Sequence, residues 1–157
     1  MLTRMFHSCM VRPEDITPSS DQLEVIGAFN PGAVAVDDGV VLLIRVAERP
    51  VDQRPGHIAL PRFDPGAGLQ IDWLREAAVH MVDPRVVEIK STGATRLTFI
   101  SHLVVASSKD GRTIYTLDTA RFMPQTAYET YGVEDPRITP IDDRYYFTYV
   151  AVSPHGA

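Results

Sequence analysis

Two adjacent carboxylates and an arginine stand close together in residues 132–137, where only Pro136 separates Glu134 and Asp135 from Arg137. A strongly β-prone run, residues 145–152, follows. Because proline disfavours the helical region for the preceding residue, we expect Asp135 to have an extended backbone at the entrance to a strand. Charged groups held at such a position can carry chemistry, since the sheet fixes them while the loop end stays open to ligand. Taken alone, the motif favours a surface turn in which Arg137 pairs with Glu134 or Asp135, because charged turns far outnumber active sites.

The composition indicates one ordinary domain. The chain has 157 residues, of which 45% are hydrophobic and 22% charged, with a net charge of -5, enough for a real core. The acidic balance argues against a nucleic-acid binder, which usually carries a basic face. Cys9 is the single cysteine, and no Cys/His spacing typical of a metal site occurs, so we expect neither a disulfide nor a metal.

Nothing in the sequence indicates a membrane protein. Residues 1–7 lack the apolar core of a signal peptide, and no apolar run is long enough to span a bilayer. A cytoplasmic location is therefore the expectation.

The hydrophobic pattern is mainly that of short strands. Residues 1–22 are a polar lead-in with two prolines, and residues 47–70 are rich in Pro, Gly, Arg and Asp, which indicates a loop region. Residues 71–82 are the only candidate helix, with apolar positions loosely on one face. Two turn signals, Asp37-Asp38-Gly39 and Asp142-Asp143, predict hairpins. The expected strands cover residues 23–29, 33–36, 40–46, 57–60, 86–89, 97–101, 102–107, 113–117, 138–139 and 145–152.

An internal repeat organises these strands. Asn30-Pro31, Asp83-Pro84 and Asp135-Pro136 each open a hairpin unit, at spacings of 53 and 52 residues. An all-β period of about 50 residues suits one four-stranded blade of a propeller. Because a propeller closes with about four to eight blades, we expect the lead-in to be followed by a partial β-propeller domain over residues 23–157, incomplete at its carboxyl end. Its terminal strands would then present open edges unless another chain covers them.

Several motifs together resemble glycoside hydrolase family 130, which contains the β-mannoside phosphorylases and related β-1,2-mannosidases. The resemblance runs from about residue 12 to the last residue. It rests on residues 29–33, 42–50, 83–87, 101–103, 107–111, 132–139 and 145–153. Family members are single-domain five-bladed β-propellers of roughly twice this length. The resemblance therefore implies an amino-terminal half with about two to three blades.

The resemblance also implies a reaction. Inorganic phosphate, as co-substrate, attacks the anomeric carbon of a terminal β-mannosyl unit with inversion and releases mannose 1-phosphate; no other cofactor is implied. Asp135 matches the proton donor, which acts through the 3-hydroxyl of the mannose. Such a carboxyl must stay protonated near neutral pH. Glu134 would raise the pKa of Asp135 if the two lay close together, although consecutive strand residues point to opposite faces.

Glu134 and four further residues are candidate sugar contacts. Asn30 and Arg45 correspond to family positions that line the mannosyl subsite, where an amide and a guanidinium each grip adjacent hydroxyls. Arg45 alternatively points outward from a strand. Arg137 orients Asp135, contacts sugar or forms a purely structural ion pair. His102 either reaches an acceptor sugar or is structural. Arg85 occupies the position of Arg137 in the second unit, which fits simple repeat architecture.

Two alternatives to phosphorolysis stay open. The phosphate-binding residues of the family lie downstream of residues 132–153, so hydrolysis of a β-mannoside by the same fold is the near alternative. An inactive half-propeller that binds sugar or serves in assembly is the other. The expected partners are a β-mannoside oligosaccharide and phosphate, with no nucleic acid and no membrane. A second copy or a second half would complete the ring.

Overall fold

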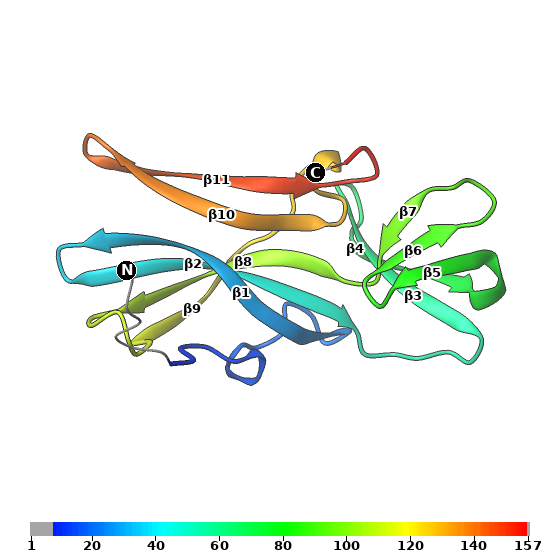
Figure 1. Cartoon of the computed structure of the whole chain (residues 1–157), viewed down its shortest axis with the longest axis horizontal. Coiled ribbons are helices and arrows are strands. Elements are labelled where there is room, and N and C mark those ends of the chain that lie inside the picture. The colour runs from blue at the N-terminus through cyan, green and yellow to red at the C-terminus, as the bar shows by residue number, and fades with distance from the viewer. Residues whose placement is uncertain (1–7, 157) are drawn as a thin grey trace, which may run out of the picture.

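The computed structural model describes residues 8–156, and these form an all-β architecture in three sheets (Figure 1). The fold class predicted from the sequence is confirmed. Three short 3-10 helices interrupt the strands: η1 (Pro13–Asp15), η2 (Glu76–Ala78) and η3 (Ala127–Glu129). The strands are β1 (Leu23–Val36), β2 (Gly39–Pro50), β3 (His57–Asp64), β4 (Gly68–Arg75), β5 (Val79–Asp83), β6 (Val86–Ile89), β7 (Thr95–Leu97), β8 (Ile100–Ser108), β9 (Thr116–Phe122), β10 (Gly132–Ile141) and β11 (Arg144–Val152).

No helix within residues 8–156 has the length and apolar character needed to cross a membrane. Residues 1–7, on which the expectation of no signal peptide depends, lie outside the described part of the chain.

The largest sheet has the order β1-β2-β8-β10-β11, and β9 also pairs with β8. Strands β3 and β4 form a second sheet, and β5, β6 and β7 form a third; both lie at the same end of the molecule (Figure 1). Strand β8 pairs with β2 along its whole length, but it meets β10 only at the parallel pair Ser101 and Gly132. Gly132 has a φ of 126°, and a Cβ there would lie 2.5 Å from the backbone of Ser101. The absence of a side chain therefore allows β10 to reach β8 at this point.

The two faces of β2 pack against different parts of the chain. Leu42, Ile44 and Val46 share one face and form a core with Ile16 of the lead-in. Leu43 lies on the opposite face and packs with residues of β8 and β10, beneath the β10–β11 hairpin. Because side chains alternate along a strand, Arg45 projects to the same side as Leu43, into the space between the two hairpins.

The candidate helix over residues 71–82 is not formed. These residues lie instead in β4, η2 and β5, and β4 pairs with β3 without interruption from His57↔Arg75 to Asp64↔Gly68. Strand pairing and the burial of Leu60, Val79 and Val87 in one cluster outweigh the weak helical pattern. The loop predicted for residues 47–70 is confirmed only at residues 51–56 and 65–67. The rest of that range lies in β2, β3 and β4, and the predicted short strand at residues 57–60 lies within β3.

Several hairpins agree with the sequence. The turns at residues 37–38 and 142–143 join β1 to β2 and β10 to β11, and residues 86–89 form β6. Residues 23–29 and 33–36 are one strand rather than two, because the chain passes Asn30 and Pro31 through a β-bulge. Residues 97–101 were expected to be one strand but divide between β7 and β8, and β9 begins three residues later than predicted and ends at Phe122.

Candidate active site

Two β-bulges fix the backbone at the candidate site. The register of β1 against β2 shifts between Phe29 and Gly32, and that of β10 against β11 shifts between Glu134 and Arg137. Asn30 and Asp135 occupy these bulges, and each has a φ of 47°. The extended backbone predicted for Asp135 is therefore wrong. A bulge needs a locally kinked residue, and Asn and Asp are the side chains that best tolerate the left-handed region.

The two bulges lie against each other. A Cβ on Gly32 would come within 2.9 Å of the carbonyl oxygen of Pro136, so β1 and β10 are in close contact here. Across this contact, Nδ2 of Asn30 donates a hydrogen bond of 3.0 Å to Oδ1 of Asp135. The first and third repeat units thus bring their opening residues together. The second unit differs, because Asp83 and Pro84 stand at the turn between β5 and β6.

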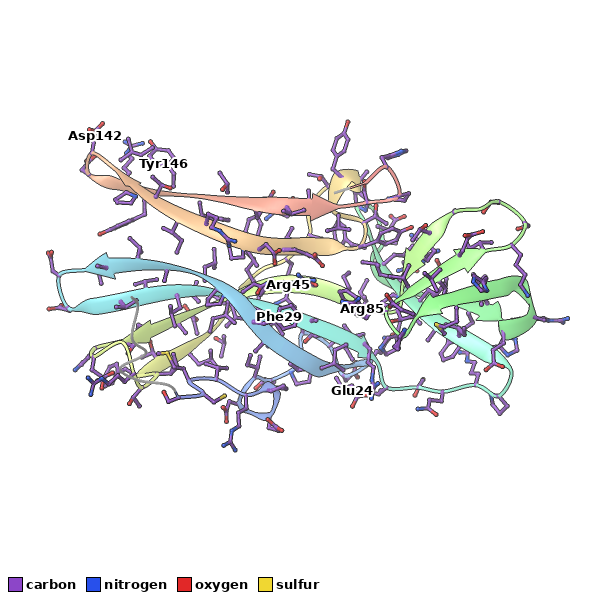
Figure 2. All side chains as sticks on the ribbon, in the orientation of Figure 1. Glu24, Phe29, Arg45, Arg85, Asp142 and Tyr146 are labelled. Carbon is purple, nitrogen blue, oxygen red and sulfur yellow. The ribbon has the colours of Figure 1, made fainter. Side chains whose placement is uncertain are left out.

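Arg45 joins the two carboxylates. Its Nη1 lies 3.0 Å from Oδ1 of Asp135 and its Nη2 lies 2.6 Å from Oε1 of Glu134. The guanidinium also lies over the ring of Phe29, 4.8 Å from its centroid. Figure 2 labels both residues near the middle of the large sheet. The Arg45 side chain is only 11% exposed. A charge within the apolar run of β2 is explained by this arrangement, because two carboxylates and a ring face replace water around the guanidinium.

Ser101 is a member of the cluster that the sequence did not indicate. Its Oγ donates to Oε1 of Glu134 at 3.0 Å and accepts from Nε of Arg45 at 3.4 Å. The available signal was alternation: Ser101 and His102 are neighbours on a strand, so only one of them can face the site. The residue that faces the cluster is Ser101, and the prediction that His102 does so is wrong.

The bulge also resolves how consecutive carboxylates share one cation. Glu134 and Asp135 both reach Arg45, although neighbours on a regular strand would point to opposite faces. The Glu134 side chain is 14% exposed and that of Asp135 is 37% exposed. Glu134 is therefore the enclosed carboxylate and Asp135 the open one.

The electrostatics of the pair are opposite to the expectation. Burial raises the pKa of Glu134 above its ordinary value, and the charge of Asp135 adds to this, while Arg45 and Ser101 oppose it. The hydrogen bond from Asn30 lowers the pKa of Asp135 most. The hydrogen bond from Arg45 and the positive charge of Arg45 lower it further. The proximity of the two carboxylates therefore acts on Glu134, and in this structure Asp135 is the more acidic of the two.

Arg137 and Arg85 do not join the cluster. Arg137 is exposed and donates from Nη1 to the carbonyl oxygen of Pro136 at 2.8 Å. Its positive charge is the smallest of the named influences that lower the pKa of Asp135. Arg85 pairs with Asp83 in its own turn, so its place in the repeat does not give it an equivalent position.

His102 lies on the other face of the sheet. It pairs with Val46 across the β2–β8 ladder, and its side chain is 1% exposed. Its Nε2 lies 3.3 Å from Oε1 of the fully buried Glu48, whose carboxylate also accepts hydrogen bonds from the backbone N–H and the Oγ of Ser19. The acceptor-sugar interpretation of His102 is excluded by this burial, and its role is structural.

Replacing Glu48 with Gln is expected to destabilise the fold by about 2 kcal/mol. The carboxylate accepts hydrogen bonds from Ser19 at both oxygens, whereas the amide nitrogen of Gln is itself a donor and cannot accept one. Burial alone would raise the pKa of Glu48, but His102 and Ser19 outweigh it and hold that pKa below its ordinary value. A lowered carboxyl pKa stabilises above the unfolded pKa and is lost as pH falls through the folded pKa. Thermal unfolding should therefore show a difference at pH 7 that shrinks in acid. Glu88→Gln, at an exposed position of β6, is the control, and equal melting temperatures would contradict this account.

Within residues 8–156, no three His, Cys, Asp or Glu side chains lie close enough together to hold a metal ion. The cluster consists instead of one amide, one guanidinium, one hydroxyl and two carboxylates. That set can hydrogen-bond a polyhydroxylated ligand and offer it a carboxyl group.

Comparison with known proteins gives related sequences over nearly the whole chain. Residues 95–157 match the glycoside hydrolase family 130 model, described as beta-1,4-mannooligosaccharide phosphorylase. A beta-1,2-mannobiose phosphorylase of Listeria innocua is 37% identical over 153 residues, which are 94% of this chain and 43% of that protein. A second beta-1,2-mannobiose phosphorylase, from Thermoanaerobacter, is 41% identical over 51 residues, which are 32% of this chain and 17% of that protein.

A comparison with solved structures gives a relative of the same kind. A solved structure of beta-1,2-mannobiose phosphorylase from Listeria innocua, in complex with beta-1,2-mannobiose, matches with a TM-score of 0.83 and 37% identity. The match covers 92% of this chain and 42% of that one, so the chain spans less than half the length of these relatives. The chain is therefore similar over nearly its whole length to part of these phosphorylases, and it has the fold of the corresponding part of a β-propeller.

Proposed function

We propose that this chain supplies the mannosyl-binding residues and the catalytic acid of a glycoside phosphorylase that cleaves terminal β-mannosidic bonds. The observation that carries the proposal is that Asn30 and Arg45 both donate hydrogen bonds to one oxygen, Oδ1 of Asp135. The names of the relatives support a mannoside as substrate and phosphorolysis as the reaction class.

Asn30 and Arg45 are suited to hold the sugar. An amide and a guanidinium present donors at fixed spacing, and adjacent hydroxyls of a pyranose can accept from both. In the free site these donors hold the pKa of Asp135 low. When sugar hydroxyls take the donors, the carboxylate loses the interactions that favour its charged form, and its pKa rises. Binding of substrate thus prepares Asp135 to carry a proton.

In the proposed reaction, one proton passes from Asp135 to the leaving group. A phosphate oxygen forms a bond to the anomeric carbon as the bond to the leaving sugar oxygen breaks, which inverts the configuration. The proton of Asp135 passes through the 3-hydroxyl of the mannose to the leaving oxygen, so the departing group leaves as a neutral alcohol. Glu134 keeps Arg45 in place through the 2.6 Å contact and takes no part in the proton transfer.

The test is formation of mannose 1-phosphate from β-1,2-mannobiose by the purified chain, with and without inorganic phosphate, while its mass in solution is recorded. Any mannose 1-phosphate that forms should depend on inorganic phosphate. Release of mannose at the same rate without phosphate would assign hydrolysis instead.

A second form of the protein is needed because the chain spans 43% of the Listeria innocua relative. In this joined protein, the chain is fused to the remaining part of that relative. No product from a folded joined protein, in an assay where the relative itself is active, would contradict the proposal and favour an inactive half-propeller.

A further inference from the structure

Phe29 lies beside the Asp135 cluster, although its side chain has no hydrogen-bonding group. It is the direct partner of Arg45 in the β1–β2 ladder, so the two side chains are neighbours on the same face of the sheet. Cζ of Arg45 lies over the Phe29 ring, 4.8 Å from its centroid, and Figure 2 labels the two residues together. Phe29 is 39% exposed, whereas the Arg45 side chain is 11% exposed. The ring therefore stands between part of the guanidinium and the solvent.

Gly27 sets the direction of this ring. Residues 27 and 29 lie on the same face of β1, because the pairing with β2 is regular from Gly27 to Phe29. A Cβ on Gly27 would lie 2.4 Å from Cε1 and 2.9 Å from Cδ1 of Phe29, closer than real side chains approach. Gly27 is buried and its φ is not in the left-handed region. Space for the ring, and not backbone conformation, is therefore the reason for glycine at this position.

The hydrogen bonds of Arg45 hold it less firmly once a sugar is bound. Its Nη1 donates to Asp135, and the proposed mechanism transfers that donor to sugar hydroxyls. Its Nε lies 3.4 Å from Oγ of Ser101, which is a long hydrogen bond. The 2.6 Å contact of Nη2 with Glu134 remains, but a group held at one nitrogen can turn about that contact. The Phe29 ring attracts the cation through its π face, and this attraction does not depend on whether Asp135 carries a proton.

We propose that Gly27 and Phe29 are positioning residues, in which the ring, seated on Gly27, holds the Arg45 guanidinium in the orientation that receives the mannosyl unit. This inference rests on the proposed function, and it assigns a role to two residues that take no part in the proton transfer. Loss of the ring weakens the grip on the mannosyl unit equally in the ground state and the transition state. Such a change raises KM and leaves kcat nearly unchanged.

The orientation of Arg45 can be measured without turnover. In the full chain labelled with ¹⁵N-arginine, the Nε–H of Arg45 gives an NMR peak that is assigned by its absence from Arg45→Lys. The ring current of Phe29, 4.8 Å from Cζ, displaces this peak from the usual arginine position. Phe29→Leu keeps an apolar side chain but removes the π face, so we expect the peak to return to the usual position. Phe29→Tyr keeps the π face and should keep the displaced peak.

Gly27→Ala tests the seat separately from the ring. It retains Phe29 but occupies the space beneath it, so the Arg45 peak should move as it does in Phe29→Leu. Added to Phe29→Ala, the same substitution should have no further effect on the peak, because the seat is then empty. Gly66→Ala is its control, since Gly66 lies in the exposed turn between β3 and β4 and a Cβ there meets only an ordinary contact at 3.5 Å. Phe147→Leu is the control for the ring, because Phe147 is 40% exposed on β11. Both controls should leave the peak in place.

The joined protein provides the kinetic test. Phe29→Leu and Gly27→Ala should each raise KM for β-1,2-mannobiose about tenfold, the effect of one partly buried cation–π contact, and Phe29→Tyr should restore it. An Arg45 peak that stays in place in Phe29→Leu, or a KM that changes as much in Phe147→Leu, would overturn the inference. A displaced peak that depends on Phe29 and Gly27, with no product from the joined protein, would disprove the proposed reaction and leave the seat of Arg45 established.

Discussion

Asp135→Asn in the joined protein is expected to lower the turnover of β-1,2-mannobiose by about 100-fold to 10,000-fold, the usual contribution of a general acid. An amide cannot deliver an acidic proton, so the leaving sugar would have to depart as an alkoxide. The fold should survive, because asparagine tolerates the left-handed backbone at φ 47° and its side-chain oxygen still accepts from Asn30. The measurement is the rate of mannose 1-phosphate formation, accompanied by thermal unfolding.

Asp142→Asn is the matched control for this substitution. Asp142 also has a positive φ, 52°, and it lies in the exposed turn between β10 and β11, away from the cluster. It should leave turnover unchanged. A mannoside with a leaving group that needs no proton should recover much of its rate with Asp135→Asn. Normal kinetics on unactivated substrate would remove Asp135 from the role of acid.

Arg45→Met is expected to have the largest effect on stability, about 3 kcal/mol. Methionine fills a similar volume but leaves the largely buried carboxylate of Glu134 without its cation. The pKa of Glu134 is already raised by burial, and loss of Arg45 removes the main influence that lowers it. A carboxyl whose folded pKa lies above its unfolded value loses stability as pH rises through the folded pKa. The variant should therefore be least stable near neutral pH and regain stability as pH falls.

The double variant Arg45→Met/Glu134→Gln separates charge from packing. Neutralising Glu134 should restore most of the stability lost at pH 7 and remove the pH dependence, while sugar binding stays impaired. Arg75→Met is the control for replacing an exposed arginine on a strand. Chemical denaturation between pH 4 and pH 8 provides the measurement. A loss in Arg45→Met that is independent of pH and unchanged by Glu134→Gln would show that the ion pair is not its cause.

Local signals in the sequence were sufficient for much of the fold. The turns at 37–38 and 142–143 depend on Asp and Gly chemistry within a few residues, and the structure confirms both. The helix predicted for residues 71–82 was wrong, because over so short a run the apolar residues Trp73 and Leu74 fit both the helical and the strand periodicity. Their strand state is fixed by pairing with β3, a contact that no local pattern contains.

The site shows the same division between local and distant information. Asn30, Arg45 and Asp135 were selected through the family resemblance, and the structure brings them together. The direction of the pKa shift on Asp135 was not predictable, because it depends on which donors reach Oδ1 across the bulges.

The contact between the two bulges also bears on how the protein folds. Asn30 and Asp135 are 105 residues apart, whereas each hairpin that carries one of them closes through a two-residue turn. Closing a long loop costs more chain entropy than closing a short one, and contacts distant in sequence form slowly. We therefore expect the hairpins to form early and to dock late. During synthesis, residue 135 must leave the ribosome before Asn30 can find its partner, so the cluster around Asp135 assembles only after two hairpins distant in sequence have docked.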